Sequence, residues 1–392
     1  MSSLDGIKVL DFTHFIAGPY CTQTLGDHGA EVIKIEPIGG EPSRVDNPMA
    51  EDVSLYYSSF NRNKKGMSLD LKSNEGKEII EMLVKDADIL VTNYAAGVPE
   101  RLGIDYETLS KINPRLIVVH ITGFGLTGPY KNESAFDGII QAMSGVNSLT
   151  GETNGDPMKS GIFIADHLAG NQGVIGALLA LNERKSSNRG QLVDVSMLDS
   201  MVSMLAYNFS LITELNVSPQ RAGNRSTNVF STTFPTQDGY IYIAPLTQKM
   251  WNSFSVAIGQ PTWANEDSKY YLENDRLKYY EELEAKIASW TKQHNTDEIT
   301  ELLKKHRVAC GKINSIEDVL KDPQLKERGM FLEMDIKGKE ITVPGKVVKL
   351  SNDKKRLDVR PPNIGEHTTE ILLEAGFDRK AIDEFYSNKI IG

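Results

Sequence analysis

The sequence of 392 residues has few cysteines and no long apolar run, and each absence excludes a class of protein. Only two cysteines occur, Cys21 and Cys310, which excludes a disulfide framework and a cysteine-rich zinc site. The seven histidines are scattered and form no H-E-x-x-H motif, so no metal site is expected. No run approaches the ~18 apolar residues that span a bilayer, and the opening MSSLDGIKVLDF lacks the pattern of a signal peptide. A cytoplasmic protein without membrane contact is therefore expected.

The chain also has fewer basic than acidic residues. The formal net charge is −10 at pH 7, which argues against a general nucleic-acid surface and still allows a local basic pocket. The composition, with 40% hydrophobic and 24% charged residues, is that of an ordinary soluble globular protein. A chain of this length is expected to form a large α/β core and a second unit.

The first half of the chain alternates short β-branched runs with helical stretches. The residue pattern predicts strands at 7–12, 31–36 and 116–122 and helices at 74–87 and 166–182. This alternation predicts an α/β protein with a large Rossmann-like parallel sheet covered by helices.

The composition of the sequence changes near residue 216. Residues 216–228, NVSPQRAGNRSTN, are polar and irregular, which predicts a linker. The expected organisation is a large domain over 1–215 and a smaller α/β domain over 229–330.

The stretch ITGFGLTGP places Gly123, Gly125 and Gly128 at the G-x-G-x-x-G spacing of a dinucleotide site. The required context is missing, because Pro129 and the following YKNES make a poor helix start. The ribose-binding acid is expected ~20 residues further on, and Asp137 is much too close. A tight turn is therefore favoured, and an NAD-dependent oxidoreductase is kept only as an alternative.

Two polar groups follow predicted strands at the edge where open parallel sheets bind ligands. His14 follows the first strand, and Asn93 ends a strand later in the chain. The segment NRNKKGMSLDLK adds four cations: Arg62, Lys64, Lys65 and Lys72. These cations suit an anionic ligand, although charge alone favours a solvated basic loop.

Asp166 ends an apolar run in GIFIADHLAGNQGVIGALLAL, where a glycine- and alanine-rich helix begins. An aspartate at such a position is commonly an N-cap. The same geometry is expected to keep the carboxylate ionised, and Ala165, Ala169 and Gly170 leave room for a bulky ligand. From the residues alone a cap is favoured, and a carboxylate nucleophile is the alternative.

Many segments together resemble one family, the class III CoA-transferases, which includes formyl-CoA and carnitine CoA-transferases. They are the segment around Asp166 and VLDFTH, AGP, GAEVIKIEP, NRNKKGMSLDLK, ERLGIDYETL, GFGLTGPY, FDGIIQAMSG, RGQLVDVSMLDS and PPNIGEHTTEIL. The resemblance covers nearly the whole chain. It implies a transferase that moves CoA from an acyl-CoA donor to a carboxylic acid acceptor, with no tightly bound cofactor and no metal.

The resemblance also implies roles for individual residues. Asp166 is the implied nucleophile, which forms a mixed anhydride and then an aspartyl-CoA thioester. CoA is expected to contact seven further positions: His14, Ala17, Leu69, Lys72, Asn93, Tyr94 and Arg101. On charge alone, Arg44 or the basic cluster is expected to meet the CoA phosphates. The implied fold is an interlocked homodimer in which residues 331–392 return to the large domain.

The chain departs from the family pattern at several points. Ile16 replaces the glutamine of the formyl-CoA branch, and the glycine-run loop of that branch is not found, so a larger or less polar acyl group is expected. Ala95 and Ala96 stand where many members have Arg-Pro, so a phosphate contact from that arginine is absent or comes from elsewhere. The related α-methylacyl-CoA racemases are the second choice, because Phe136 occupies the place of their histidine base. We also expect Gly123 and Gly125 to let the backbone approach the reacting end of CoA.

Overall fold

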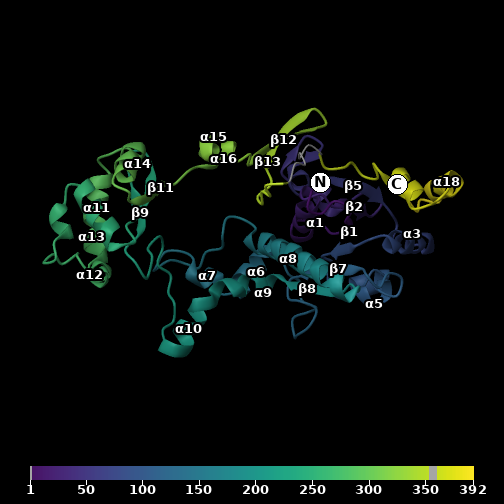
Figure 1. The fold of residues 1–392 in the computed structure, drawn as a ribbon, viewed down its shortest axis with the longest axis horizontal. Coiled ribbons are helices and arrows are strands. Elements are labelled where there is room, and N and C mark those ends of the chain that lie inside the picture. Colours follow the sequence, from purple (N-terminus) through teal and green to yellow (C-terminus); the bar gives the residue numbers. More distant parts are fainter. Residues whose placement is uncertain (1, 353–359) are drawn as a thin grey trace. The chain divides into compact units, whose positions relative to one another are not determined.

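The computed structural model describes residues 2–352 and 360–392 and divides into two compact units (Figure 1). The first unit comprises Met1–Val146, Lys159–Asn216 and Gln324–Gly392, and the second comprises Asn147–Met158 and Val217–Pro323. Residues 147–158 thus belong to the second unit, whereas the sequence-based division placed them in the large domain. Met1 and residues 353–359, which fall in the expected large-domain segments, lie outside the described residues.

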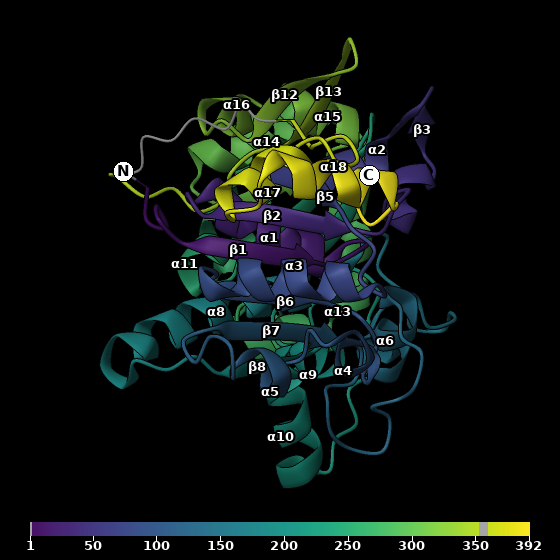
Figure 2. The ribbon, with the colours of Figure 1, turned by 90° about the vertical axis from the view of Figure 1, so that its right-hand side faces the viewer.

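A six-stranded parallel sheet forms the centre of the first unit, which confirms the predicted α/β architecture. The strand order is β5-β2-β1-β6-β7-β8, and Figure 2 shows the strands stacked in this order. Its strands are β1 (Lys8–Phe12), β2 (Glu31–Glu36), β5 (Lys64–Ser68), β6 (Ile89–Thr92), β7 (Ile117–Thr122) and β8 (Leu192–Ser196). The segment NRNKKGMS, expected as a basic loop, therefore contains the edge strand β5.

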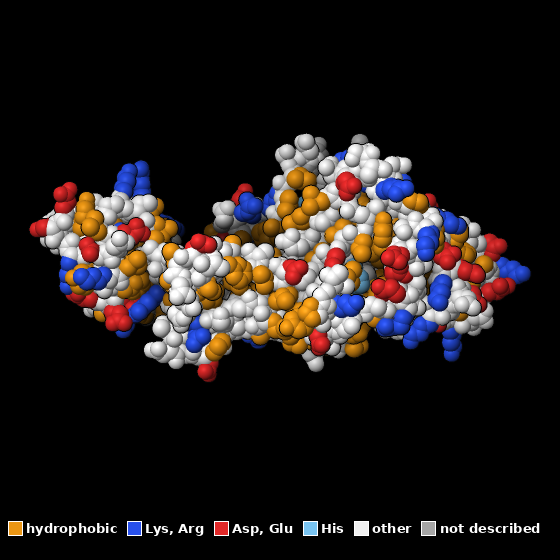
Figure 3. Space-filling model, turned by 90° about the horizontal axis from the view of Figure 1, so that it is seen from below, with side chains coloured by type: hydrophobic (Ala, Val, Ile, Leu, Met, Phe, Trp, Pro, Cys, Tyr) orange, Lys and Arg blue, Asp and Glu red, His pale blue; other side chains and the backbone are white. Residues whose placement is uncertain are grey.

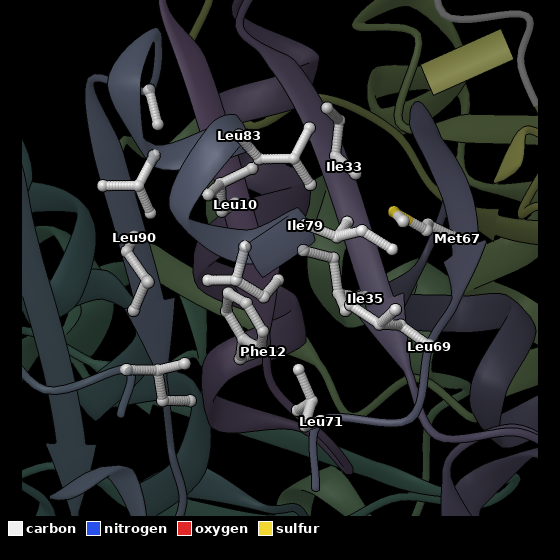
Figure 4. Close-up of a cluster of buried hydrophobic side chains, with 14 of the residues drawn as sticks. Leu10, Phe12, Ile33, Ile35, Met67, Leu69, Leu71, Ile79, Leu83 and Leu90 are labelled. Carbon is white, nitrogen blue, oxygen red and sulfur yellow. The ribbon is translucent and has the colours of Figure 1, made fainter. Parts of the chain in front are cut away.

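Helices cover both faces of this sheet and enclose one core on each face. Residues of α3 (Asn74–Lys85), α17 (Thr368–Glu374) and α18 (Arg379–Ser387) pack on one face, where Figure 4 shows Ile79 and Leu83 of α3 against Leu10 and Phe12. On the other face, α1 (Ala17–Asp27) and α8 (Ile164–Ser187) pack against β1, β6 and β7. Each fully buried aliphatic side chain contributes ~1.5–3 kcal/mol to these cores.

The small residues of α8 have a packing role that the sequence did not reveal. A Cβ on Gly170 would lie 2.7 Å from the Ala17 carbonyl oxygen, and one on Gly173 would lie 3.0 Å from the Cys21 sulfur. Ala165 and Ala169 are fully buried in the same core. These residues therefore let α8 approach α1 closely, which contradicts the expectation that they leave room for a ligand.

The C-terminal segment packs on the edge strand β5. The N–H of Gly66 donates to His367 Nδ1 at 3.1 Å, and the N–H of His367 donates back to the Gly66 carbonyl at 2.8 Å. Leu69 forms a β-bridge with Ile391. The end of the chain thus covers the edge that β5 would otherwise expose.

The remaining elements of the first unit are short. They are β3 (Met49–Ala50), β4 (Val53–Ser54), β12 (Phe331–Ile336), β13 (Lys339–Pro344), α2 (Leu55–Phe60), α4 (Val98–Leu102), α5 (Tyr106–Leu109), α6 (Asp137–Met143), α9 (Met197–Val202) and α10 (Ala206–Leu215), with 3₁₀ turns at Pro42–Val45 and Ser203–Leu205. Two helices, α7 (Val146–Leu149) and α16 (Pro323–Glu327), straddle the unit boundaries.

The second unit has a three-stranded antiparallel sheet in the order β11-β10-β9. Its core forms around Trp251, Phe254 and Leu283, all fully buried. Its elements are β9 (Thr232–Pro235), β10 (Tyr240–Ala244), β11 (Ala309–Lys312), α11 (Gln248–Ala257), α12 (Glu273–Lys278), α13 (Tyr280–Thr291), α14 (Thr296–Lys305) and α15 (Ile316–Lys321), with a 3₁₀ turn at Pro261–Ala264. Residues 216–228, all of them described, form no helix or strand. Across residues 2–352 and 360–392, no helix combines the length and apolar character that a membrane span requires.

Candidate active site

The carboxyl ends of β1, β6 and β7 surround a cavity of about 880 Å³. The chain runs from β1 outward to β2 and β5, and then resumes on the other side of β1 with β6, so the order reverses between β1 and β6. Ligands of open parallel sheets bind at such a reversal. His14 after β1, Asn93 after β6 and Gly123 after β7 line the cavity together with Asp166.

The loops after β1 and β6 are tied to each other. The N–H of His14 donates to Asn93 Oδ1 at 2.9 Å, and Asn93 Nδ2 donates to the His14 carbonyl at 2.8 Å. Phe15 has a φ of 62°, a left-handed conformation that is strained for a bulky side chain. Burial lowers the pKa of His14, so its imidazole is neutral at pH 7. This turn presents a preformed wall of the cavity.

A buried ionic network of Asp11, Lys34 and Lys64 also holds this turn in place. Lys34 Nζ donates to the Thr13 carbonyl at 2.8 Å, and Lys64 Nζ lies 2.9 Å from Asp11 Oδ2. Asp11 also accepts the N–H and the hydroxyl of Thr13 at 2.9 and 2.5 Å. Burial opposes ionisation of Asp11, but the ammonium groups of Lys64 and Lys34 outweigh it and hold the pKa of Asp11 at about 2.

Asp166 lies in the first turn of α8 and is not its N-cap, which contradicts the capping interpretation. The N-cap is Phe163, whose side chain makes no capping bond, and Asp137 of α6 serves instead. Asp137 Oδ1 accepts the N–H of Ala165 at 2.8 Å and the N–H of Asp166 at 3.4 Å. The side chain of Asp166 is thereby left available to the cavity that it lines.

The protonation of Asp166 also differs from the expectation. Burial and then the charge of Asp137 raise the pKa of Asp166 from 3.8 to about 7. The carboxyl group is therefore partly protonated at neutral pH, which contradicts the expectation that it stays ionised. A raised carboxyl pKa in a cavity is typical of functional sites.

Aromatic side chains form much of the cavity wall. Tyr56 of α2 lines it, and burial followed by the charge of Asp166 raises the pKa of this phenol, which stays protonated. The other aromatic residues in the wall are Phe15, Tyr94, Phe124, Phe136 and Phe163. Ile16, expected to shape the acyl pocket, is 1% exposed and is not among the lining residues. The apolar character therefore comes from aromatic residues.

Only some of the CoA-binding positions implied by the resemblance come together at the cavity. His14, Ala17, Asn93 and Tyr94 line it with Asp166. Three others are not lining residues: Leu69 is fully buried in the sheet core, and Lys72 and Arg101 are exposed. Sequence reasoning missed Tyr56, Phe163 and the capping role of Asp137.

Most of the cations expected at the CoA phosphates are used inside the fold. Arg44 donates from Nε and Nη2 to the two carboxylate oxygens of Glu36 at 2.7 and 2.6 Å. Arg62 donates from Nε and Nη2 to the carboxylate of Asp27 at 3.0 and 2.6 Å. Lys64 is fully buried against Asp11. The expectation that these three groups meet phosphates is therefore contradicted. Lys65 contacts Glu31 and Glu370 at 3.0 and 2.8 Å, whereas Lys72 is exposed.

The glycine-rich loop has two separate roles. Gly123 lines the cavity, and a Cβ there would lie 2.0 Å from Ala135 Cβ. Gly125 has a φ of 83° and is not a lining residue, and a Cβ there would lie 3.5 Å from Ser196 Cβ and 3.7 Å from Asp194 Oδ1. The approach of the backbone to CoA therefore stays a prediction for Gly123, while Gly125 allows the turn.

Within residues 2–352 and 360–392, no group of three or more His, Cys, Asp or Glu side chains is arranged to hold a metal ion.

The fold is an α/β fold whose cavity lies at the carboxyl edge of a parallel sheet, the edge where open sheets of this kind bind ligands. Residues 4–368 match the model of CoA-transferase family III, and the chain belongs to that family. It is therefore a transferase of the CoA-transferase class.

Known proteins resemble the chain over nearly its full length. Succinyl-CoA:mesaconate CoA-transferase of Haloarcula marismortui is 35% identical, over 96% of this chain and 98% of that protein. Formyl-CoA:oxalate CoA-transferase of Afipia carboxidovorans is 34% identical, over 100% and 98%. The crystal structure of a CAIB/BAIF family protein from Brucella suis superposes with a TM-score of 0.86 and 34% identity, covering 95% of this chain and 99% of that one.

Proposed function

We propose that this chain transfers CoA from an acyl-CoA to a carboxylic acid through covalent intermediates on Asp166. Membership of CoA-transferase family III supports the reaction class. The observation that carries the assignment to Asp166 is its place in the cavity wall, with a pKa raised to about 7 by burial and Asp137. A carboxylate of higher basicity is a better nucleophile, and the acyl-aspartyl form carries no charge to desolvate.

The reaction balances without an external energy source. A carboxylate oxygen of Asp166 attacks the thioester carbonyl, the C–S bond breaks, and a mixed anhydride and CoA thiolate form. The thiolate attacks the aspartyl carbonyl carbon, which releases the donor acid and leaves an aspartyl-CoA thioester. The acceptor carboxylate then forms a second mixed anhydride and frees the thiolate, which attacks the acceptor carbonyl and restores the Asp166 carboxylate. Each step exchanges one acyl linkage for another.

The residues around Asp166 divide into two groups in this proposal. His14, Ala17, Asn93 and Tyr94 form the wall that receives the thioester end of CoA. Lys72 and Arg101 are exposed cations that suit the phosphates, and Leu69 holds the strand end that precedes Lys72. In this proposal the polyanionic part of CoA lies at the protein surface.

The substrate acid is proposed to be larger than formate or oxalate. A cavity of about 880 Å³ with aromatic walls has room for an apolar carbon skeleton. Lys131 and Lys159 also line it and offer positive charge for an acid acceptor in a site that contains Asp46, Glu133, Asp137 and Asp166. Since a relative uses succinyl-CoA and mesaconate, dicarboxylic acids are included among the candidates.

The direct kinetic test compares the parent with Asp166→Ala in a screen of donors and acceptors. Succinyl-CoA and formyl-CoA are incubated with aliphatic, aryl and dicarboxylic acids, and new CoA thioesters are identified by mass spectrometry. We expect the parent to form new thioesters and the variant to form none. An active Asp166→Ala enzyme would contradict the proposal, and rapid deuterium exchange at the acyl α-carbon without an acceptor would favour a racemase.

We further propose that the chain forms a homodimer. Helix α10 has no buried residue, and its apolar side chains Tyr207, Phe209, Ile212 and Leu215 are 46–65% exposed. A helix with so much exposed apolar surface is typical of a protein-protein interface. The family resemblance supports a second copy of this chain as its partner.

A further inference from the structure

Asp137 and Gln141 form a buried polar pair beside Asp166, and the proposed reaction sequence does not use them. Both belong to α6, where Asp137 is 8% exposed and Gln141 is fully buried. Gln141 Nε2 donates to Asp137 Oδ2 at 2.5 Å. A buried carboxylate is costly unless its oxygens receive hydrogen bonds, so the surroundings of this pair require an explanation.

The pair holds the chain segment that leads into Asp166. Gln141 Oε1 accepts the N–H of Ser160 at 2.8 Å, and Gln141 Nε2 also donates to the Ile162 carbonyl at 3.3 Å. Asp137 Oδ1 accepts the N–H groups of Ala165 and Asp166. The two side chains therefore fix residues 160–166 at several points, from the approach to α8 through its first turn.

The hydrogen-bond pattern requires a carboxylate at position 137. Oδ1 receives two backbone N–H groups and Oδ2 receives an amide N–H, so every partner is a donor. An asparagine would turn its own NH₂ group toward one of these donors. The helix N-terminus also stabilises the negative charge of Asp137.

The negative charge of Asp137 lies close enough to Asp166 to oppose ionisation of the Asp166 carboxyl group. Capping the N–H groups of Ala165 and Asp166 requires only one acceptor oxygen, which a neutral side chain also carries, without repulsion of a neighbouring carboxylate. The repulsion disappears when Asp166 becomes part of a neutral anhydride or thioester. The arrangement therefore destabilises the free carboxylate relative to the covalent intermediates.

We propose that Asp137 is a positioning residue for Asp166, whose charge and hydrogen bonds hold the nucleophile in place and favour its conversion to the neutral acyl form. This inference rests on the proposed function of Asp166. Gln141 completes the clamp by holding Asp137 and residues 160–162.

Other charged and titratable groups line the same cavity as Asp166 or lie beside it on α8. Their contributions are the same in the parent and in variants at position 137, so a comparison between these proteins isolates Asp137. These groups are His14, Asp46, Tyr56, Tyr94, Lys131, Glu133 and Lys159 from the cavity wall and His167 from the same helix turn.

The test measures the rate of covalent labelling of Asp166 by acyl-CoA in a single turnover, as a function of pH. For Asp137→Asn we expect a maximal rate ~10- to ~100-fold lower than the parent rate, since the nucleophile is misplaced. The acid limb of the profile should move to lower pH, because the repulsion that opposes ionisation is removed. Gln141→Leu should slow labelling and leave the acid limb in place, because it removes no charge.

Asp105→Asn provides a matched control. Asp105 caps α5 in the same unit, accepting the N–H of Thr108 at 2.9 Å, and it does not line the cavity. This variant should keep the rate and the pH profile of the parent. Asp137→Ser replaces Asp137→Asn if the latter does not fold, because serine also caps helices and is neutral.

The outcomes separate this inference from the proposed function. An unchanged acid limb in the Asp137 variants would overturn the inference, and so would failure of both variants to fold, since Asp137 would then serve the fold as a whole. If the parent itself forms no adduct on Asp166, the proposed function fails instead.

Discussion

In the proposed reaction, the protonation state of Asp166 decides its reactivity. Only the ionised carboxylate attacks a thioester, and its pKa is raised from 3.8 to about 7. The fraction of ionised Asp166 therefore falls tenfold for each pH unit below about 7. Since kcat/KM reports the free enzyme, we expect it to rise with pH along this limb and to level off above pH 8. Initial rates with one acyl-CoA from pH 5 to 9 measure this profile, and a plateau extending down to pH 5 would contradict the assignment.

The same shift predicts how stability depends on pH. Because the folded pKa of Asp166 lies above its unfolded value, the folded state binds more protons between about pH 4 and pH 7. The contribution of Asp166 to stability is thus present at low pH and is lost as the pH rises through about 7. Asp166→Asn should exceed the parent in unfolding free energy by ~1–3 kcal/mol at pH 8 and by less at pH 5, after allowance for partial exposure. Urea unfolding at both pH values measures this difference, and a difference that does not grow with pH would contradict the raised pKa of Asp166.

Single residues also show what the sequence allows one to predict. Asp166 could be singled out because it joins an apolar run to a helix rich in small residues. Its relation to Asp137 could not be predicted, since the two carboxylates meet only when α6 packs against α8. Tyr56 was missed for the same reason, because a tyrosine in a short helix carries no signal of its distant neighbours.

At the scale of elements, the strand β5 shows how a basic segment can serve the fold. Lys64 points into the network with Asp11, and Arg62 pairs with Asp27, so their charges are neutralised in the interior. The expected elements α3 and β7 are present with shifts of one or two residues at their ends, whereas α8 continues five residues beyond its expected end at residue 182. The strand β5 was not expected, because lysine and glycine are uncommon in strands and its partner segments are distant in sequence.

Two lysines of this region test the distinction between fold and ligand. Lys64→Ala leaves the Asp11 carboxylate buried without its nearest ammonium, and we expect a loss of ~3–5 kcal/mol in unfolding free energy. Lys72→Ala removes an exposed cation, so stability should change by less than ~0.5 kcal/mol. The KM for acyl-CoA should nevertheless rise in Lys72→Ala, because the proposed site pairs this cation with a CoA phosphate. Urea unfolding and initial-rate kinetics on both variants decide this, and an unchanged KM in Lys72→Ala would remove it from the CoA site.

On the scale of the whole molecule, exposed apolar surface is the feature that a single chain leaves unexplained. Figure 3 shows apolar side chains exposed on one face among charged residues. Helix α10 contributes Phe209 and Ile212, which are 46% and 47% exposed. The sequence alone marked this stretch only as a helix, because apolar residues predict burial without identifying the surface that covers them.

The dimer can be tested through these residues. We expect the parent to have the mass of a dimer in light scattering, and Phe209→Glu/Ile212→Glu to shift it toward the monomer. Leu272→Glu is the control, since Leu272 is 58% exposed in the second unit and should leave the mass unchanged. A parent that is monomeric at micromolar concentration would rule out the proposed assembly.

The most direct test of the account is the chemical identity of the acylated residue. The parent is incubated with an acyl-CoA without acceptor, treated with hydroxylamine or borohydride, and digested for mass spectrometry. We expect a hydroxamate or a reduced side chain on the peptide that contains Asp166, and on the matching peptide of Asp105→Asn, but no modification in Asp166→Ala. Turnover without any modification at Asp166, or modification at another carboxylate in its place, would contradict it.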